Sequence, residues 1–329
     1  MKQGALTRRE FLVLSGAGTL AAGVLSPQSS LAQAPTIKQG YQTNIWGMPT
    51  YYLLKSGLLE KRGIKFEEFA VASGNLTMQQ MVGRQVDLGT YAGPSFILGH
   101  ARGQLVAIAQ IEEVGKTTRI MARKELGIKT VAQLKGLKIA NQTGSSISQV
   151  FVDQIAPKAG LKKEDWQEVR MNVNDMVAAM AAKTVDAMIN VEPYNAIAEA
   201  DGLATTIMNY WDVDRMPVFM AATPEYVEKN PDAVVRYLRA WLDVASDFKN
   251  NRKKVSDTIY AFYTSKGYKM SPDTFAKAVE TIEVAPQFPA DVKGYMQAQA
   301  QVLLREKKIK EIPDWSKALR PEFMQKARS

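Results

Sequence analysis

The chain has 329 residues, and 46% of them are hydrophobic, which is enough for a large core and more than one domain. It contains no cysteine and one histidine, His100, which excludes disulfides, thiol chemistry and a multi-histidine zinc site. The formal net charge is +9, but the basic clusters at 252–254 and 307–308 are interleaved with acidic residues. This pattern indicates a solvated basic surface that attracts anionic solutes, and it does not favour nucleic acid as a partner.

Residues 1–32 have the three-part pattern of a cleaved signal peptide, with a basic start, an apolar stretch and a polar end. The run at 7–12 reads Thr-Arg-Arg-Glu-Phe-Leu, which is typical of the twin-arginine export signal. Cleavage is expected after Ala32, because a cut after Ala34 would place Pro35 directly beyond the scissile bond. The alternative is an uncleaved membrane anchor, although the apolar stretch is short for a bilayer span. The sequence therefore predicts export to the periplasm.

Beyond the leader, the chain predicts two copies of one pattern of alternating strands and helices. The first copy has strands at 37–41, 64–70 and 86–91, with helices at 49–62 and 75–83. The second copy has strands at 137–141, 166–171 and 185–191, with helices at 145–160 and 174–183. Asp87 and Asp186 hold matching places in the two copies. Such alternation implies parallel sheets with helices on both faces, so each copy is expected to form one lobe.

Two apolar segments, 118–122 and 217–222, are predicted to cross from the first lobe to the second and back. A mostly helical tail follows, and helix starts are marked where Thr223, Asn230 and Ser271 each precede a proline. The predicted organisation is a leader at 1–32, a first lobe at 33–120 and 222–329, and a second lobe at 121–221. Two crossings would make a hinge that closes the lobes around a ligand.

The loops that follow the strands are the predicted ligand site, because ligands gather at the carboxyl ends of parallel strands. The segment 143–146, Thr-Gly-Ser-Ser, combines a glycine with hydroxyl donors and suits an oxyanion such as sulfonate, carboxylate or phosphonate. The alternative is an ordinary serine cap of a helix. The predicted ligand-binding residues are Asn44, Trp46, Met48, Tyr51, Ser73, Gly74, Asn75, Tyr91, Ala92, Gly93, Thr143, Gly144, Ser145, Ser146, Asn190 and Glu192.

Two of these residues have open roles. Trp46 would form part of an apolar wall of the cleft, or it would pack in the core. Glu192 places a carboxylate in a cleft suited to anions, where it would bind a ligand amine or hold a cleft-lining residue in place. The sequence predicts no catalytic residue, no metal and no cofactor, since it has no Walker loop and no cluster of metal-ligand residues.

From residue 37 to 241 the chain resembles the periplasmic binding proteins of aliphatic sulfonate, nitrate and taurine ABC importers, with the related thiamine-pyrimidine precursor binders. The likeness rests on 52–63 with Ser-Gly-Leu-Leu-Glu at 56–60, on 83–89, on Leu-Lys-Gly-Leu-Lys at 134–138 before Gly144, and on Asp186 before Glu192. It implies a type II binding-protein fold: two doubly wound α/β lobes joined by two hinge strands, with the helical C-terminal tail on lobe 1. It also implies a monomer that hands its solute to an inner-membrane permease with a cytoplasmic ATPase.

The resemblance also brings two alternatives. Some members of the superfamily are enzymes that make the thiamine pyrimidine with a histidine and a cysteine-rich motif, whereas this chain has no cysteine and carries His100 elsewhere. A receptor that feeds a sensor instead of a transporter is the other alternative. The expectation is a binding protein and not an enzyme. Its solute would be sulfonate-, nitrate- or taurine-like, or an aromatic acid.

Overall fold

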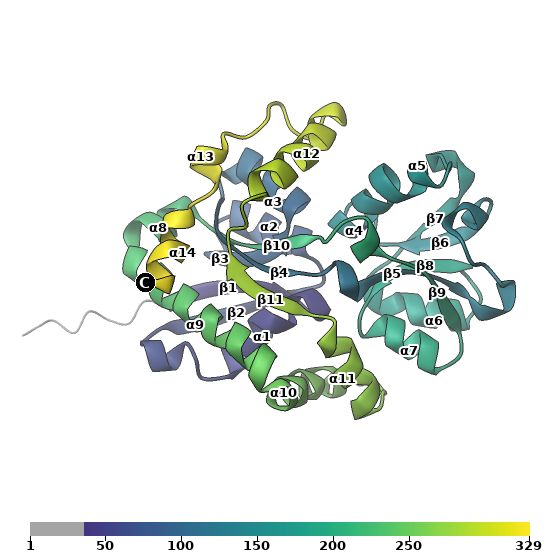
Figure 1. The fold of residues 1–329 in the computed structure, drawn as a ribbon, viewed down its shortest axis with the longest axis horizontal. Helices are drawn as coiled ribbons and strands as arrows, with labels where there is room; N and C mark the ends of the chain where they lie inside the picture. Colours follow the sequence, from purple (N-terminus) through teal and green to yellow (C-terminus); the bar gives the residue numbers. More distant parts are fainter. Residues whose placement is uncertain (1–35) are drawn as a thin grey trace, which may run out of the picture. The chain divides into compact units, whose positions relative to one another are not determined.

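The computed structural model describes residues 36–329, so the predicted leader and its cleavage point at Ala32 lie outside the described residues. Two separate sheets organise the described chain, and each has helices on both faces (Figure 1). We call the six-stranded sheet and its helices the first lobe, and the five-stranded sheet and its helices the second lobe. The predicted fold class, two α/β lobes of the type II binding-protein kind, is confirmed.

The first-lobe sheet has the strand order β11-β4-β10-β3-β1-β2. Its strands β1 to β3 are parallel, whereas β10 runs antiparallel to both β3 and β4. The helices α1, α2 and α3 connect the strands of this lobe before the chain leaves it. The bounds are β1 Thr36–Gln42, α1 Met48–Lys55, β2 Lys65–Val71, α2 Gly74–Val82, β3 Leu88–Ala92, α3 Gly93–Gly103, β4 Val106–Glu113, β10 Pro217–Ala222 and β11 Glu283–Gln287.

The second-lobe sheet has the strand order β7-β6-β8-β5-β9. Here β6 is parallel to β7 and β8, and β5 is antiparallel to β8 and β9. The predicted helix at 145–160 is interrupted by a π-helical turn, Phe151–Ile155, between α4 and α5. The bounds are β5 Thr118–Arg123, β6 Lys138–Asn141, α4 Ser146–Val150, α5 Ala156–Lys158, β7 Gln167–Arg170, α6 Met176–Ala181, β8 Ala187–Val191, α7 Tyr194–Ala200 and β9 Ala204–Asn209.

The two copies of the sequence repeat form equivalent parts of the two sheets. The local order β2-β1-β3 in the first lobe corresponds to β7-β6-β8 in the second. The Asp87 carboxylate accepts a hydrogen bond from the Lys38 backbone N–H at 3.0 Å, and the Asp186 carboxylate accepts one from the Lys138 N–H at 2.9 Å. Asp87 lies just before β3 and Asp186 just before β8. Each aspartate therefore connects the third strand of its repeat to the start of the first strand, β1 or β6.

The sheets are mixed and not purely parallel, because the two crossings of the chain add antiparallel strands. The segment predicted as the outward crossing forms β5 in the second sheet, and the one predicted as the return forms β10 in the first. The chain changes lobes at 114–117 and again at 210–216, where the backbone forms short turns. We therefore propose lobe boundaries in these turns, a few residues from the predicted positions at 120 and 221.

The helical tail packs mainly against the first-lobe sheet and its helices, and its helix α11 also contacts α7 of the second lobe. The longest helix, α9 (Pro231–Asn250), buries Val234, Leu238, Trp241 and Phe248 along one side. It lies against β11 and α14, and α12 lies against α3. The tail consists of α8 Pro224–Lys229, α9, α10 Arg252–Ser265, α11 Pro272–Glu280, α12 Val292–Arg305, α13 Trp315–Ala318 and α14 Pro321–Arg328.

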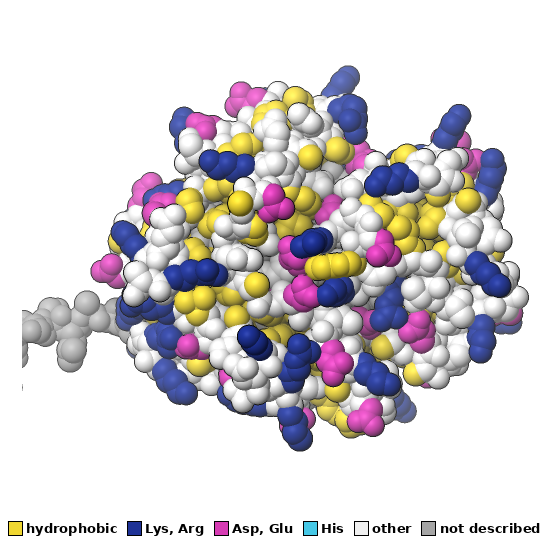
Figure 2. Space-filling view, viewed as in Figure 1, with side chains coloured by type: hydrophobic (Ala, Val, Ile, Leu, Met, Phe, Trp, Pro, Cys, Tyr) yellow, Lys and Arg dark blue, Asp and Glu magenta, His cyan; other side chains and the backbone are white. Residues whose placement is uncertain are grey.

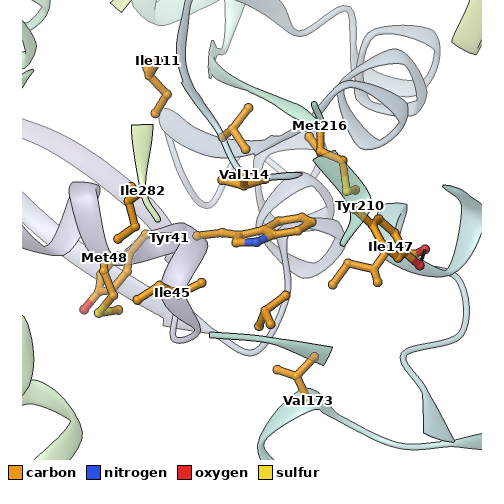
Figure 3. Close-up of a cluster of buried hydrophobic side chains, with 14 of the residues drawn as sticks. Tyr41, Ile45, Met48, Ile111, Val114, Ile147, Val173, Tyr210, Met216 and Ile282 are labelled. Carbon is orange, nitrogen blue, oxygen red and sulfur yellow. Dashed lines mark hydrogen bonds between the residues drawn. The ribbon is translucent and has the colours of Figure 1, made fainter. Parts of the chain in front are cut away.

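One apolar cluster continues from the first lobe into the second. Figure 3 shows Ile45 of the first lobe in the same cluster as Ile147 and Val173 of the second, together with Val114 and Tyr210 from the two crossing segments. All five side chains are at most 2% exposed. The lobes therefore touch in this conformation, which we call closed.

The face of the molecule drawn in Figure 2 carries basic side chains scattered among acidic ones. This distribution agrees with the expected solvated basic surface. Across residues 36–329, no helix has both the length and the apolar character needed to cross a bilayer.

Candidate ligand-binding site

A cavity of about 420 Å³ lies between the lobes, where the parallel strands end and their helices begin. Both lobes contribute to its wall, and the loops involved include two that the repeat predicted. From the first lobe the lining residues are Ser73, Asn75, Leu76 and Gln79, and from the second lobe they are Gln142, Thr143, Gly144, Ser145, Arg170, Met171 and Asn172.

The two serines of the cavity occupy matching places at helix starts. Ser73 caps α2 by accepting a hydrogen bond from the Leu76 N–H, and Ser145 caps α4 by accepting one from the Ser148 N–H. The serine cap that was the alternative for 143–146 is thus present, and Ser73 forms an equivalent cap in the first lobe. They are compatible with a ligand, because a helix start carries partial positive charge whether or not its cap is satisfied.

The two glycines of these loops are required for different reasons. At Gly74 a side-chain carbon would lie 2.7 Å from Tyr91 Cβ and 2.8 Å from Gln42 Nε2. Gly144 has a φ of 82°, a left-handed conformation that residues with side chains rarely adopt, and open space around it. Gly74 therefore permits close packing behind the cavity, and Gly144 permits the turn at its edge.

We expect Gly74→Ala to lower the free energy of unfolding by about 1–3 kcal/mol, because the added methyl group overpacks this site. Urea unfolding followed by circular dichroism measures the change. The matched control is Gly294→Ala in α12, where no atom lies within 4 Å of the added carbon. That control should stabilise the protein by about 0.5–1 kcal/mol, since alanine favours a helix over glycine. Equal effects of the two substitutions would contradict the packing argument.

Arg170 is the charged group of the cavity. It is the last residue of β7, its side chain is exposed, and it forms no ion pair with any residue of 36–329. No other charged side chain from the described residues lines this cavity. Arg170 is not among the predicted site residues, because 166–171 was predicted to be a strand and the site was expected in the loops that follow strands. The end of a strand belongs to the same edge as the loop, and that signal was available.

Three other predicted residues, Ser146, Asn44 and Trp46, do not line the cavity and instead form hydrogen bonds that connect parts of the structure. The Ser146 hydroxyl is 3.3 Å from the Ser95 hydroxyl, a hydrogen bond between the lobes. The Asn44 side chain accepts a hydrogen bond from the Trp46 N–H, and the Trp46 indole N–H donates to the Thr117 hydroxyl at 2.8 Å. Trp46 is 5% exposed, so in the closed form it has the packing role that was the alternative to a cleft wall.

The other predicted residues of the first lobe do not line the cavity, which corrects the expectation. Met48, Tyr91 and Ala92 are buried in the hydrophobic clusters, and Gly93 packs against Tyr295. Tyr51 packs between Tyr41 and Phe262. The physical reason is that the structure places these residues in α1, β3 and the start of α3, where they pack in the core, whereas the sequence analysis assigned them to loops.

In the second lobe, Asn190 and Glu192 are also fully buried behind the cavity. The Asn190 amide donates to the Val173 carbonyl. Glu192 forms an ion pair with Arg119 at 2.5 Å and accepts a hydrogen bond from the Ala196 N–H. Burial raises the pKa of Glu192, although Arg119 partly opposes this shift. The carboxylate thus pairs with Arg119 of β5, which is not among the residues that line the cavity.

Two other cavities are large enough to hold a small ligand, and one of them adjoins this site. One of about 400 Å³ shares Asn75 and residues 143–145 with it and extends to Asp153 and Glu306. A larger one, about 1030 Å³, involves the first lobe alone, between the end of α3 and residues 308–320. His100 lines that larger cavity. Within 36–329, His, Asp and Glu side chains form no group of three or more that could hold a metal.

These features define a class of protein. Two lobes with equivalent parallel cores are joined by two crossings, and a cavity of ligand size opens between the carboxyl ends of their strands. This is the arrangement of a type II periplasmic binding protein.

Comparison with known proteins gives the family. Residues 44–254 match the model of the NMT1/THI5-like family, so the chain belongs to that family. It is 29% identical over 314 residues to a protein of Brucella abortus named as a binding protein, covering 93% of this chain and 95% of the relative. It is 30% identical over 228 residues to a protein of Escherichia coli named as an aliphatic sulfonates-binding protein, covering 68% and 69%.

Solved structures share the fold. The alkanesulfonate-binding protein SsuA of Xanthomonas axonopodis superposes with a TM-score of 0.76 at 20% identity, covering 87% of this chain and 98% of that one. The desulfurization enzyme DSZB superposes with a TM-score of 0.66 at 14% identity, covering 89% and 99%. The fold alone therefore accommodates both binding and catalysis.

Proposed function

We propose that the protein is the extracytoplasmic solute-binding component of an ABC importer, which captures a small anion between its lobes and delivers it to the permease. The observation that carries the proposal is the cavity lined by both lobes, with Arg170 as its single charged side chain among the described residues. The remaining lining consists mainly of hydroxyl and amide side chains, which donate hydrogen bonds to an oxyanion.

The relatives support this reading. A relative that covers most of the chain is named as a binding protein, and another is named for aliphatic sulfonates. A sulfonate, a carboxylate, a phosphonate or nitrate each presents oxygen atoms to Arg170 and to the polar wall. We further propose that the mature protein begins near residue 33, after twin-arginine export to the periplasm, and that it works as a monomer.

A solute screen tests the proposal. Mature protein is heated with alkanesulfonates, taurine, nitrate, aromatic carboxylates, phosphonates and a neutral pyrimidine in separate wells. A ligand present at 100 times its Kd stabilises the native state by about 2.7 kcal/mol, which raises Tm by about 5 °C or more. We expect such a rise for at least one anion and none for the pyrimidine. Absence of a rise with every anion would overturn the proposal.

The same samples separate a receptor from an enzyme. Calorimetry should show one solute bound per chain, and chromatography after prolonged incubation should recover the solute unchanged. Chemical conversion of the bound solute would instead favour a catalytic role like that of the enzyme that shares the fold.

A further inference from the structure

Two carboxyl groups from different lobes meet at the edge of the cleft. Asp153 lies in the π-helical turn of the second lobe, and Glu306 directly follows α12 in the first lobe. Both line the adjoining cavity of about 400 Å³, and a side-chain hydrogen bond with Glu306 is among the causes that raise the pKa of Asp153, after burial. Asp153 Oδ2 is shielded from solvent and has no hydrogen-bond donor among the described residues.

The charges around this pair differ between its two members. Lys308 Nζ lies 2.6 Å from Glu306 Oε2, and Arg305 is the last residue of the helix that precedes Glu306. The same cavity is lined by Arg102 of α3 and by Lys163 and Glu168 of the second lobe. Gln154, the residue after Asp153, donates a hydrogen bond to the Asp214 carboxylate at 3.0 Å and not to the pair. The close cations favour an ionised Glu306, so a proton shared by the pair resides on Asp153.

We propose that Asp153 and Glu306 share a proton across the cleft, and that this contact makes closure of the lobes favourable in mildly acidic surroundings. The inference rests on the proposed function in one respect, since it concerns the opening and closing of the same ligand cleft. Two ionised carboxylates in contact repel each other, whereas a protonated carboxyl donates a hydrogen bond to its ionised partner.

The direction of the pH effect follows from the two conformations. In the closed form, burial and the nearby Glu306 raise the pKa of Asp153 to about 6. In an open form the lobes separate, and the carboxyl returns to its ordinary pKa of about 3.9. The closed form therefore binds more protons between these values, and acidification favours it. Between pH 7.5 and 5.0 the ratio of closed to open protein should rise about tenfold.

The absence of cysteine from the chain makes this measurable without a ligand. Cysteines introduced at the exposed residues Lys158 of α5, in the second lobe, and Lys293 of α12, on the first lobe, carry the two spin labels. Electron paramagnetic resonance then gives the distribution of distances between the labels at pH 7.5 and 5.0. We expect the short distances to gain population at pH 5.0, by about tenfold relative to the long ones.

Two variants test the pair itself. Asp153→Asn and Glu306→Gln each supply an amide donor that does not titrate, so each should be mainly closed at pH 7.5 and insensitive to pH. The matched control is Asp201→Asn, an exposed acid of the second lobe after α7, which should keep the full pH response. Thermal unfolding of each variant verifies that it folds.

A parent protein without a pH response, or an Asp153→Asn variant that retains it, would overturn the inference. Because the labels report closure in the absence of solute, this outcome is distinct from that of the solute screen. Closure that responds to pH in a protein that binds none of the anions would leave the inference standing and remove the proposed function.

Discussion

Replacing Arg170 with methionine is expected to weaken binding of the anion found in the solute screen about 10- to 100-fold. A hydrogen bond to a charged group contributes about 1.5–3 kcal/mol, and each 1.4 kcal/mol corresponds to a factor of ten in Kd. Arg170 is the one charged side chain that the described residues bring to this cavity, so no nearby cation replaces it. Isothermal titration calorimetry of parent and variant measures the change.

The control for net charge is Arg252→Met at the start of α10, which removes the same charge from an exposed position outside the cavity. It should leave the affinity within about twofold, since surface substitutions have small effects. Both variants should unfold at the same denaturant concentration as the parent. Unchanged affinity in Arg170→Met would exclude this arginine from the site, and an equal loss in both variants would indicate only long-range attraction.

Replacing Arg119 with methionine is expected to lower the free energy of unfolding by about 3 kcal/mol at pH 7, because it leaves Glu192 buried without its counter-ion. Burial already raises the pKa of Glu192, and loss of the arginine raises it further. The folded variant then binds a proton more readily than the unfolded chain. Its stability should therefore recover as the pH falls from 7 toward 5. Urea unfolding at each pH measures this.

A double variant isolates the pair. Arg119→Met combined with Glu192→Gln removes the buried charge as well, so most of the lost stability should return and the pH dependence should disappear. Lys253→Met, which breaks the exposed pair with Asp257, should cost less than about 0.5 kcal/mol. A double variant as unstable as Arg119→Met would show that packing of the arginine stem, and not its charge, is responsible.

Much of the fold could be predicted because the same local pattern of alternating strands and helices occurs twice in the sequence. Alternating strands and helices, the matching pair Asp87 and Asp186, and the prolines at helix starts are features of neighbouring residues. The equivalent orders β2-β1-β3 and β7-β6-β8, and the equivalent positions of the two aspartates, agree with this repeat. The antiparallel strands β5 and β10 were harder to place, because the sheet that receives a crossing strand is set by long-range packing.

The site was predicted less completely for a related reason. Ser73, Asn75 and residues 143–145 were found because they sit at helix starts, which a sequence displays. Whether a loop residue faces the cavity or the core depends on the backbone direction, and Tyr91 faces the core. The contact between Asp153 and Glu306 joins the two lobes and residues far apart along the chain. No local pattern encodes such a contact, since only the tertiary fold brings the two side chains together.

The hydrogen bond from the Trp46 indole to Thr117 has a consequence for how a bound solute is reported to the rest of the molecule. The indole belongs to the loop after the first strand, and Thr117 lies in the segment where the chain first changes lobes. Bending of the backbone at Thr117 should therefore change the surroundings of the Trp46 indole. Native tryptophan emission, with no dye attached, should shift in wavelength as the molecule opens, which would make the unmodified protein an optical sensor of its own solute.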